Sequence, residues 1–142
     1  MRTFNPTDRR IIELPRELID LVKQPSTAYI ATLMPDGSPQ LSQTWIDTDG
    51  QYVIFNTPEE FQKARNLRRD PRIAITVSDP AEPSRYYAVR GTVISMTRKG
   101  GADHIETLAQ RYLGGPYPWY GGRDQIRIIV TVQAERIHAQ GG

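Results

Sequence analysis

One segment organises this chain, Asn56-Thr-Pro-Glu-Glu-Phe-Gln-Lys-Ala-Arg-Asn-Leu-Arg-Arg-Asp-Pro-Arg72, which follows an apolar, strand-like run at residues 52–55. The segment predicts a change from strand to helix at its first residues. Thr57 stands where a helix N-cap belongs, Pro58 stands at the first helical position, and Glu60 completes a Thr-x-x-Glu capping box. We therefore expect a short helix that begins with this cap.

The same helix carries a cluster of cations. Asp70-Pro71 ends the helix, because proline lacks the amide proton and restricts the residue before it, and Lys63 and Arg65 lie ahead of that stop. The pattern favours a phosphate-binding site, because a helix start offers free amide protons and a capping hydroxyl, and a lysine follows about two turns later. A solvated basic face on a helix that packs on the core explains the same residues, so the pattern alone leaves both interpretations open.

Composition bounds the class of protein. A chain of 142 residues predicts one domain, residues 1–142, with a single sizeable core. The net charge is +2 and the pI about 9.0, an excess that is too small to demand nucleic acid but suits an anionic small molecule. Cysteine is absent, which excludes disulfides and thiolate chemistry. No apolar run approaches the roughly 20 residues of a membrane helix, and the first residues lack the apolar core of a signal peptide, so we expect a cytoplasmic protein with no membrane partner.

Patterning predicts mostly strands. A short N-terminal helical extension, within residues 1–25, is expected from its 3/4 apolar spacing, and a second clear helix is expected at 102–113. Asp49-Gly50 is a strong hairpin signal, and pairing of the strands beside it would complete a three-strand meander. Gly91, inside a long strand, indicates a bulge or a close backbone approach. The expected strands are 27–33, 39–47, 51–55, 72–78, 86–95 and 125–134.

The order of these elements predicts the fold class. Six strands joined mostly by hairpins, with helices inserted between them, predict a mainly β fold, an antiparallel barrel with appended helices. A doubly wound parallel sheet needs a helix after nearly every strand, and this chain lacks those helices. No repeat, low-complexity tract or linker divides the chain.

The usual catalytic constellations are absent. Two histidines, His104 and His138, cannot make a histidine-rich metal site, and we expect His138 in a C-terminal tail. No nucleophile elbow, dinucleotide-binding glycine pattern or Walker loop is present. No side chain is therefore assigned as catalytic, and an enzyme with this sequence needs a bound cofactor to carry the reaction.

Two further segments fit a cofactor site. Alternation along residues 41–46 predicts Gln43 and Trp45 on one strand face and Thr44 on the other, where polar side chains can hydrogen-bond the edge of a planar heterocycle. A half-exposed strand is the alternative. The loop around Tyr117-Pro-Trp-Tyr120 either stacks on a flat ring and covers a pocket, or is a surface loop pinned by burial of its aromatic residues.

The segments Gly37-Ser-Pro-Gln-Leu-Ser42 and Lys63-Ala-Arg-Asn-Leu-Arg-Arg-Asp-Pro-Arg72 resemble those of the split β-barrel flavin and deazaflavin oxidoreductases, the superfamily of pyridoxamine 5′-phosphate oxidase. The similarity is greatest to the actinobacterial branch that uses the deazaflavin coenzyme F420. This resemblance implies a fold of the FMN-binding split-barrel type, a six-stranded antiparallel split β-barrel. It also implies a homodimer with two cofactor sites at the subunit interface.

The resemblance assigns roles to residues as well. It places the cofactor phosphate at the strand end and the following helix, and the cofactor ring along the preceding strand. Substrate contacts are expected at Trp119 and Tyr120, although their loop matches no motif of the family. The cofactor-binding candidates are Gln43, Thr44, Trp45, Asn56, Thr57, Lys63, Arg65 and Asn66.

Coenzyme F420 is the favoured cofactor, and FMN is the alternative. F420 carries a lactyl-phosphate and an oligoglutamate tail, and the arginines at positions 65, 68, 69 and 72 supply cations for its carboxylates. The expected reaction is hydride transfer from reduced F420 to a conjugated small molecule, such as an enone, a quinone or a tetrapyrrole like biliverdin. The alternatives are a non-catalytic F420- or FMN-binding carrier protein and an FMN-dependent enzyme like pyridoxamine 5′-phosphate oxidase. A nucleic-acid binder is disfavoured, because it would need the basic residues and the aromatic residues in one groove.

Overall fold

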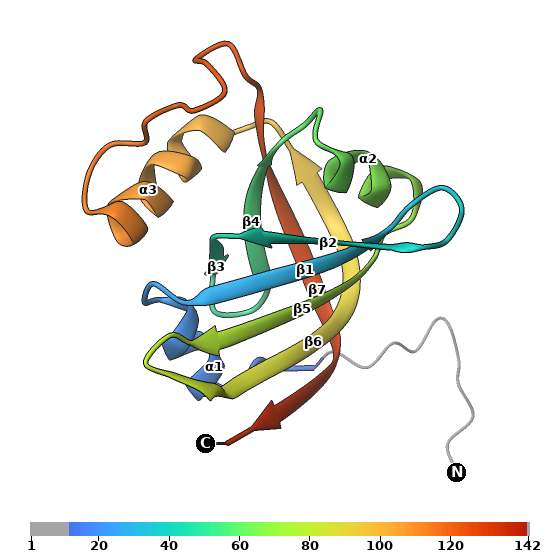
Figure 1. Ribbon diagram of the computed structural model, residues 1–142, viewed down its shortest axis with the longest axis vertical. Helices are drawn as coiled ribbons and strands as arrows, with labels where there is room; N and C mark the ends of the chain where they lie inside the picture. Colours follow the sequence, from blue (N-terminus) through green and yellow to red (C-terminus); the bar gives the residue numbers. More distant parts are fainter. Residues whose placement is uncertain (1–11, 142) are drawn as a thin grey trace.

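The computed structural model describes residues 12–141; residues 1–11, which belong to the predicted N-terminal extension, and Gly142 lie outside the described residues. Within the described part, seven antiparallel strands form one curled sheet in the order β2-β1-β5-β6-β7-β4-β3 (Figure 1). The mainly β, antiparallel fold expected from the sequence is confirmed. In chain order the elements are α1 Arg16–Val22, β1 Thr27–Leu33, β2 Pro39–Thr44, β3 Ile46–Thr48, β4 Val53–Pro58, α2 Gln62–Arg69, β5 Arg72–Asp79, β6 Glu82–Thr97, α3 Gly101–Leu113 and β7 Arg127–Gln140.

The strand predicted at 39–47 is two strands. β2 pairs with β1 whereas β3 pairs with β4, and β2 and β3 form opposite edges of the sheet, so the chain passes from one edge to the other at Trp45. The count of six strands and the continuous three-strand meander are therefore wrong. The hairpin at Asp49-Gly50 is confirmed by the pairing of Ile46 with Phe55. A single strand cannot pair at both edges of a curled sheet without a break, and no local sequence rule places that break.

The helix after β4 begins at Gln62 and not at Thr57. Thr57 and Pro58 belong to β4 and pair with β7, and no side chain caps α2. The predicted capping box is therefore wrong, because pairing with a neighbouring strand stabilises an extended backbone where local capping rules predict a helix. The predicted end is confirmed, since Asp70 follows the helix in an extended conformation.

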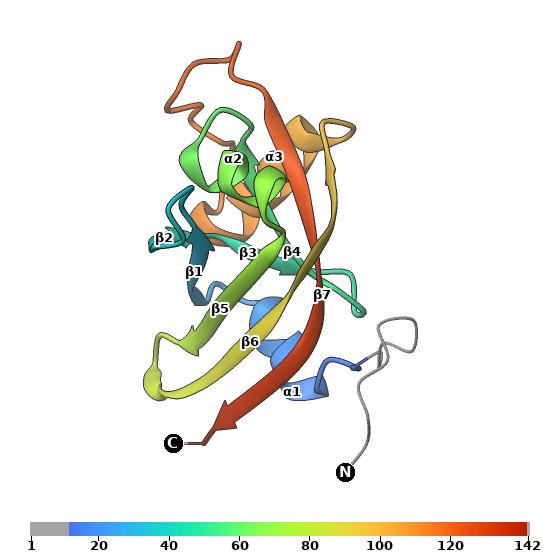
Figure 2. The same cartoon turned by 90° about the vertical axis from the view of Figure 1, so that its right-hand side faces the viewer.

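Alternate side chains of the sheet fill a core that α1 closes. Along β5, Ile73, Ile75 and Val77 are buried while the residues between them are exposed. Leu18 and Val22 of α1 belong to the same apolar cluster. Figures 1 and 2 both show α1 at one end of the curled sheet and α2 and α3 at the other, so the two ends of the core are covered by different helices.

The third helix agrees with its prediction. α3 was expected at 102–113 and buries Ile105, Leu108 and Ala109, which form a small cluster of their own with Tyr117. None of the helices within residues 12–141 is long and apolar enough to span a membrane.

The two long strands, β6 and β7, carry the bulge that the sequence predicted. A Cβ atom at Gly91 would lie 2.2 Å from the carbonyl oxygen of Gln133, and the strand register shifts next to this glycine. The close backbone approach is thus confirmed. His138 pairs with Ala88 inside β7, so its placement in a tail is wrong; continued pairing with β6 extends the strand to Gln140.

Candidate functional site

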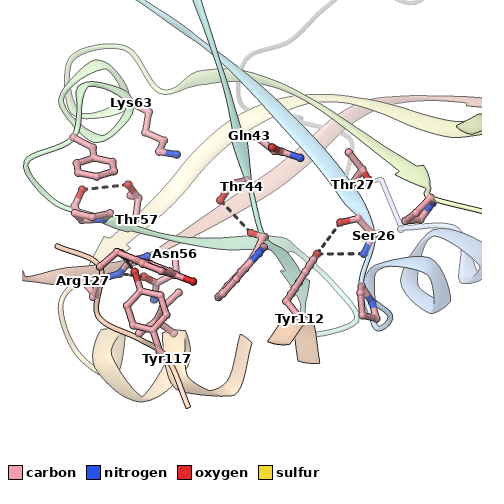
Figure 3. Close-up of a pocket in the computed structure, with 17 residues that line it drawn as sticks. Ser26, Thr27, Gln43, Thr44, Asn56, Thr57, Lys63, Tyr112, Tyr117 and Arg127 are labelled. Atoms are coloured by element: carbon pink, nitrogen blue, oxygen red, sulfur yellow. Dashed lines mark hydrogen bonds between the residues drawn. The ribbon is translucent and has the colours of Figure 1, made fainter. Parts of the chain in front are cut away.

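A cavity of ≈ 500 Å³ opens at the end of the sheet that α2 and α3 cover (Figure 3). It is lined by the segment at the start of β1, the break between β2 and β3, the end of β4 with α2, the turn between β5 and β6, and α3 with the loop that joins it to the start of β7. Its volume falls within the range of small-molecule sites, about 300–1,000 Å³. The curl of the sheet therefore gathers side chains that are far apart in the sequence.

Two cations face the cavity without an acidic partner. Lys63, in the first turn of α2, is half-buried, and its ammonium lies 6.0 Å from the centre of the Phe61 ring. Arg127, at the start of β7, is only 9% exposed. Burial lowers the pKa of Lys63, and the neighbouring charge of Arg127 lowers this pKa further. No carboxylate within residues 12–141 pairs with either cation, so two like charges converge, a repulsion that an anionic ligand would relieve.

Asn56 holds Arg127 in place. Arg127 Nε donates a hydrogen bond to Asn56 Oδ1 at 2.7 Å, and Asn56 Nδ2 donates to the Gly101 carbonyl, at the start of α3, at 2.9 Å. Asn56 Nδ2 also lies 3.1 Å from His104 Nδ1. Both amide hydrogens of Asn56 are used inside the protein, so the side chain has no donor left for a phosphate. Asn56 lies at the cavity wall as a support for Arg127.

Aromatic rings form one wall of the cavity. Trp45 stacks on Tyr112, with ring centres 5.1 Å apart and 10° between the planes, and Tyr117 meets Trp45 edge-on at 6.1 Å. The Tyr112 hydroxyl accepts from the Ile46 amide at 3.2 Å and donates to the Ser26 carbonyl at 3.1 Å, which fixes the ring between two strands. Rings held in this way present flat apolar surface on which a planar heterocycle can stack.

The opposite part of the cavity is polar but uncharged. The Ser26 side chain is 5% exposed, and its hydroxyl has no hydrogen-bond partner among the described residues. In Figure 3 Gln43 and Ser26 lie toward one side of the cavity and Arg127 toward the other. A buried hydroxyl without a partner is unfavourable, but this one is shielded from solvent and does not offer the cavity a free hydrogen-bonding group.

The loop after α3 is held by Glu106. Its carboxylate accepts from the Tyr117 amide at 2.7 Å and from the Trp119 indole N–H at 2.9 Å, and these two bonds lower the pKa of Glu106. Tyr117 is buried and covers the guanidinium of Arg127, 5.3 Å from its ring centre, whereas Tyr120 is 74% exposed at the cavity mouth. The loop is therefore pinned by its aromatic residues and also covers the cavity, which combines both interpretations of its sequence.

The structure brings most of the predicted cofactor residues together. Strand alternation predicted Thr44 on the face opposite Gln43, but β2 ends at Thr44, and both side chains line the cavity. Contact between these residues and a cofactor stays a prediction. The candidates that line the cavity are Gln43, Thr44, Trp45, Asn56, Thr57 and Lys63, together with Tyr120 from the substrate-binding pair.

Arg65, Asn66 and Trp119 do not line the cavity. Arg65 is exposed on α2, whereas Asn66 is fully buried and donates to Thr32 Oγ1 at 3.0 Å. Each helical residue turns by about 100°, so Arg65, two positions beyond Lys63, lies on the opposite side of α2. Asn66 lies nearer the side of Lys63, but its amide is used by Thr32 of β1. Trp119 packs against the cluster on α3.

Two of the four arginines expected to meet an oligoglutamate tail have internal partners. Arg69 donates to a carbonyl of β1, and Arg72 forms a bidentate pair with Asp70. Hydrogen bonds from Arg72 lower the pKa of Asp70 to about 2. Arg65 and Arg68 are the members of the set that stay exposed on α2 without a carboxylate partner among the described residues.

Sequence reasoning missed several residues of the site. Arg127, Tyr112 and Ser26 line the cavity, yet none belongs to a motif. The one signal in the sequence for Arg127 as a site residue was its position as a single cation just before an apolar run. Asp47 Oδ2 and His104 Nε2 lie 2.9 Å apart, although 57 residues of sequence separate them, and only the packing of α3 on β3 and β4 brings them together.

The arrangement suits binding of a planar molecule that carries an anionic group at one end. No histidine or carboxylate is among the residues that line the cavity within the described chain, and its walls supply binding and the exclusion of water. No group of three histidine or acidic side chains within residues 12–141 is placed to hold a metal ion.

Comparison with known proteins gives the context of this site. Residues 14–140 match the family model described as Pyridoxamine 5′-phosphate oxidase. Among solved structures, an F420 reductase shares 30% identity with a TM-score of 0.77, and the match covers 88% of this chain and 98% of that one. A conserved hypothetical protein, Rv2991 from Mycobacterium tuberculosis, shares 24% identity with a TM-score of 0.71 and coverage of 94% and 89%. A putative pyridoxamine 5′-phosphate oxidase from Listeria innocua shares 15% identity with a TM-score of 0.65 and coverage of 87% and 94%. The last two similarities concern the fold alone.

Proposed function

Because this chain belongs to the pyridoxamine 5′-phosphate oxidase family of split β-barrel proteins, we propose that it is an F420-dependent oxidoreductase acting on a conjugated small molecule. When bound, reduced F420 would supply the hydride. The protein would bind this cofactor, orient the acceptor and keep water out of the cavity. A similarity of 30% identity over 88% of the chain to a protein named F420 reductase supports the choice.

One observation carries the proposal: two cations that have no acidic partner among residues 12–141 converge beside an aromatic wall. Lys63 and Arg127 lie close enough for the charge of one to lower the pKa of the other. A folded protein gains nothing from placing two such charges together unless an anion neutralises them. The rings of Trp45 and Tyr112 beside them offer the flat surface that a ring-bearing anion needs.

Different residues of the cavity would bind different parts of the cofactor and the acceptor. Lys63 and Arg127 would hold the cofactor phosphate through charge-assisted hydrogen bonds. Gln43 would meet a polar edge of the ring, and Trp45 would stack beside it. Tyr120, which is exposed and lines the cavity, would contact the acceptor, and its hydroxyl or solvent would deliver the accompanying proton.

The exposed cations of α2 favour F420 over FMN. FMN has one terminal phosphate, which the cations of the cavity satisfy. F420 also carries an oligoglutamate tail, and Arg65 and Arg68 offer two cations on the surface of the same helix. A tail that left the cavity along α2 would meet them.

Side-by-side titration of the purified protein with F420 and FMN tests the choice of cofactor. We expect F420 to bind more tightly, with a difference that shrinks at high salt because exposed charges are screened. Turnover is then followed by the return of oxidised-cofactor absorbance when enones, quinones or biliverdin are added to reduced F420 and protein. Binding without turnover of any acceptor would instead indicate a carrier, tighter binding of FMN would indicate an FMN-dependent enzyme, and no binding of either would refute the proposal.

We further propose that the protein is a homodimer whose partner covers the outer face of β2, β1 and β5. Leu41 is 68% exposed and Tyr29 is 41% exposed on this face. Leu41 is paired across the strands with Ala31, and Ala31 with Ala74, so small apolar residues continue the surface. Gln43 pairs with Tyr29, which joins this face to the cavity.

Light scattering on the purified protein measures this association. We expect the mass of a dimer, and the substitution Leu41→Glu should shift it toward monomer by placing a charge in an apolar contact. Leu113→Glu, at an exposed residue on the end of α3, is the matched control and should leave the mass unchanged. A monomeric wild-type protein at high concentration would contradict the proposal.

A further inference from the structure

A chain of hydrogen bonds runs from a carboxylate on β3 to the cation at the cavity. Asp47 Oδ2 lies 2.9 Å from His104 Nε2, and the other oxygen of Asp47 accepts from Arg111 at 3.0 Å. His104 Nδ1 contacts Asn56, and Asn56 contacts Arg127. The side chains of Asp47 and His104 are 14% and 13% exposed, so water has little access to this series of hydrogen bonds.

The donors and acceptors in this series of hydrogen bonds have only one consistent arrangement. Arg127 Nε can only donate, so it must face the oxygen of the Asn56 amide. The Gly101 carbonyl can only accept, so it must face the nitrogen of the same amide. These two partners fix the orientation of Asn56 independently of each other, and they leave the second Asn56 N–H pointing at His104 Nδ1.

The other side of His104 leads to the same conclusion. The Thr48 amide donates to Asp47 Oδ1 at 2.8 Å and Arg111 donates to the same oxygen at 3.0 Å, and these bonds favour the ionised carboxylate, which can only accept. His104 therefore donates through Nε2 and accepts through Nδ1. This is the neutral imidazole with its proton on Nε2.

We propose that His104 is a positioning residue that sets the anion affinity of the cavity through Asn56 and Arg127. As an acceptor at Nδ1, it holds the Asn56 amide in the one orientation that presents an oxygen to Arg127. Without that acceptor, the Asn56 N–H group has no partner, and rotation of the amide would turn its nitrogen toward Arg127, where two donors would face each other. Within residues 12–141 the guanidinium would then keep only its contacts with Tyr117, a hydrogen bond of 3.3 Å to the hydroxyl and the stacking on the ring. The affinity readout rests on the proposed function, whereas the state of the imidazole does not.

Long-range proton–nitrogen correlation spectra of the ligand-free protein test the imidazole directly. The chain contains only two histidines, so the substitution His138→Gln leaves a spectrum of His104 alone. We expect a neutral ring with the proton on Nε2 at neutral pH. A proton on Nδ1, or on both nitrogens, would overturn the inference whether or not any cofactor binds.

Substitutions of His104 test its effect on binding. His104→Phe keeps the ring volume and removes the acceptor, and we expect F420 to bind about tenfold more weakly, the scale of one lost hydrogen bond to a charged group. His104→Gln restores an acceptor and a donor and should bind within about twofold of wild type. His138→Gln, at the exposed histidine of β7, is the matched control and should bind as wild type does.

A double-mutant cycle separates positioning from general damage. In an Arg127→Lys background the Nε donor is gone, so His104→Phe should change the dissociation constant of F420 by less than about twofold. An equal loss in both backgrounds, or unchanged binding in the folded single variant, would refute the positioning role. If the wild type binds neither F420 nor FMN while the imidazole has the expected form, the proposed function fails and the hydrogen-bond chain stands.

Discussion

Replacing Lys63 by methionine should weaken cofactor binding without weakening the fold. Lys63 is half-buried, has no carboxylate partner within the described residues, and lies beside the charge of Arg127. Methionine has nearly the same length but no charge, so Lys63→Met removes the repulsion between the two cations and the cost of burying an ammonium.

The expected magnitudes follow from those contacts. A hydrogen bond from a partly exposed ammonium to a phosphate contributes about 1–3 kcal/mol, so the dissociation constant of F420 should rise about 5- to 150-fold. In the ligand-free protein the same substitution should leave the free energy of unfolding unchanged or raise it by up to about 1 kcal/mol, after allowance for solvent screening. Binding and stability should therefore change in opposite directions.

Fluorescence titration with F420 and urea unfolding measure these two quantities on one preparation. Lys23→Met, at an exposed residue that follows α1, makes the same change in net charge far from the cavity and should alter neither quantity. Binding of Lys63→Met within twofold of wild type would remove Lys63 from the site. Parallel losses of affinity and stability would show instead that Lys63 supports the fold.

Three further outcomes follow from particular contacts. Glu106→Gln weakens the acceptor that holds the loop after α3, so the indole N–H of Trp119 should exchange with solvent faster, as hydrogen exchange would show; an unchanged rate would mean that other contacts hold the loop. The pKa of Asp47 is lower in the folded protein than in the unfolded chain, where it is about 3.9, so ionised Asp47 stabilises the fold at pH values above about 3.9. In acid unfolding curves the difference in free energy of unfolding between wild type and Asp47→Asn should therefore shrink as the pH falls below that value. A difference that grew in acid would refute this prediction. Gly91→Ala would push a methyl group into a backbone carbonyl and should lower the free energy of unfolding by about 3 kcal/mol or more. Gly115→Ala adds its methyl group in open space and should change the free energy of unfolding by less than about 0.5 kcal/mol in the same urea experiment. Equal effects of the two substitutions would contradict the close approach at Gly91.

Local patterns were sufficient for elements that depend on neighbours in the sequence. The strand at 27–33 was predicted with its observed bounds, and the hairpin at Asp49-Gly50 and the close approach at Gly91 were also correct. These features follow from alternate burial and from backbone conformations that few residues tolerate, and both are properties of short segments.

The same patterns failed where a distant strand decides the conformation. Thr57 and Pro58 satisfy the rules for a helix start, yet they pair with β7. The break at Trp45 exists because the strands on either side of it pair at opposite edges of the sheet. Hydrogen bonds to a neighbouring strand outweigh local preferences of a few tenths of a kcal/mol per residue.

The sequence by itself determined where most of the strands lie, the basic helix with Lys63, and the motifs that place the chain in its family. Only the tertiary structure decided that Lys63 meets Arg127 rather than Arg65, and that the Asn56 amide is already satisfied inside the protein. The reason is physical. A residue type sets which bonds a side chain can make, but the curl of the sheet sets which charges come close, and the partners already bonded decide what remains free to bind a ligand.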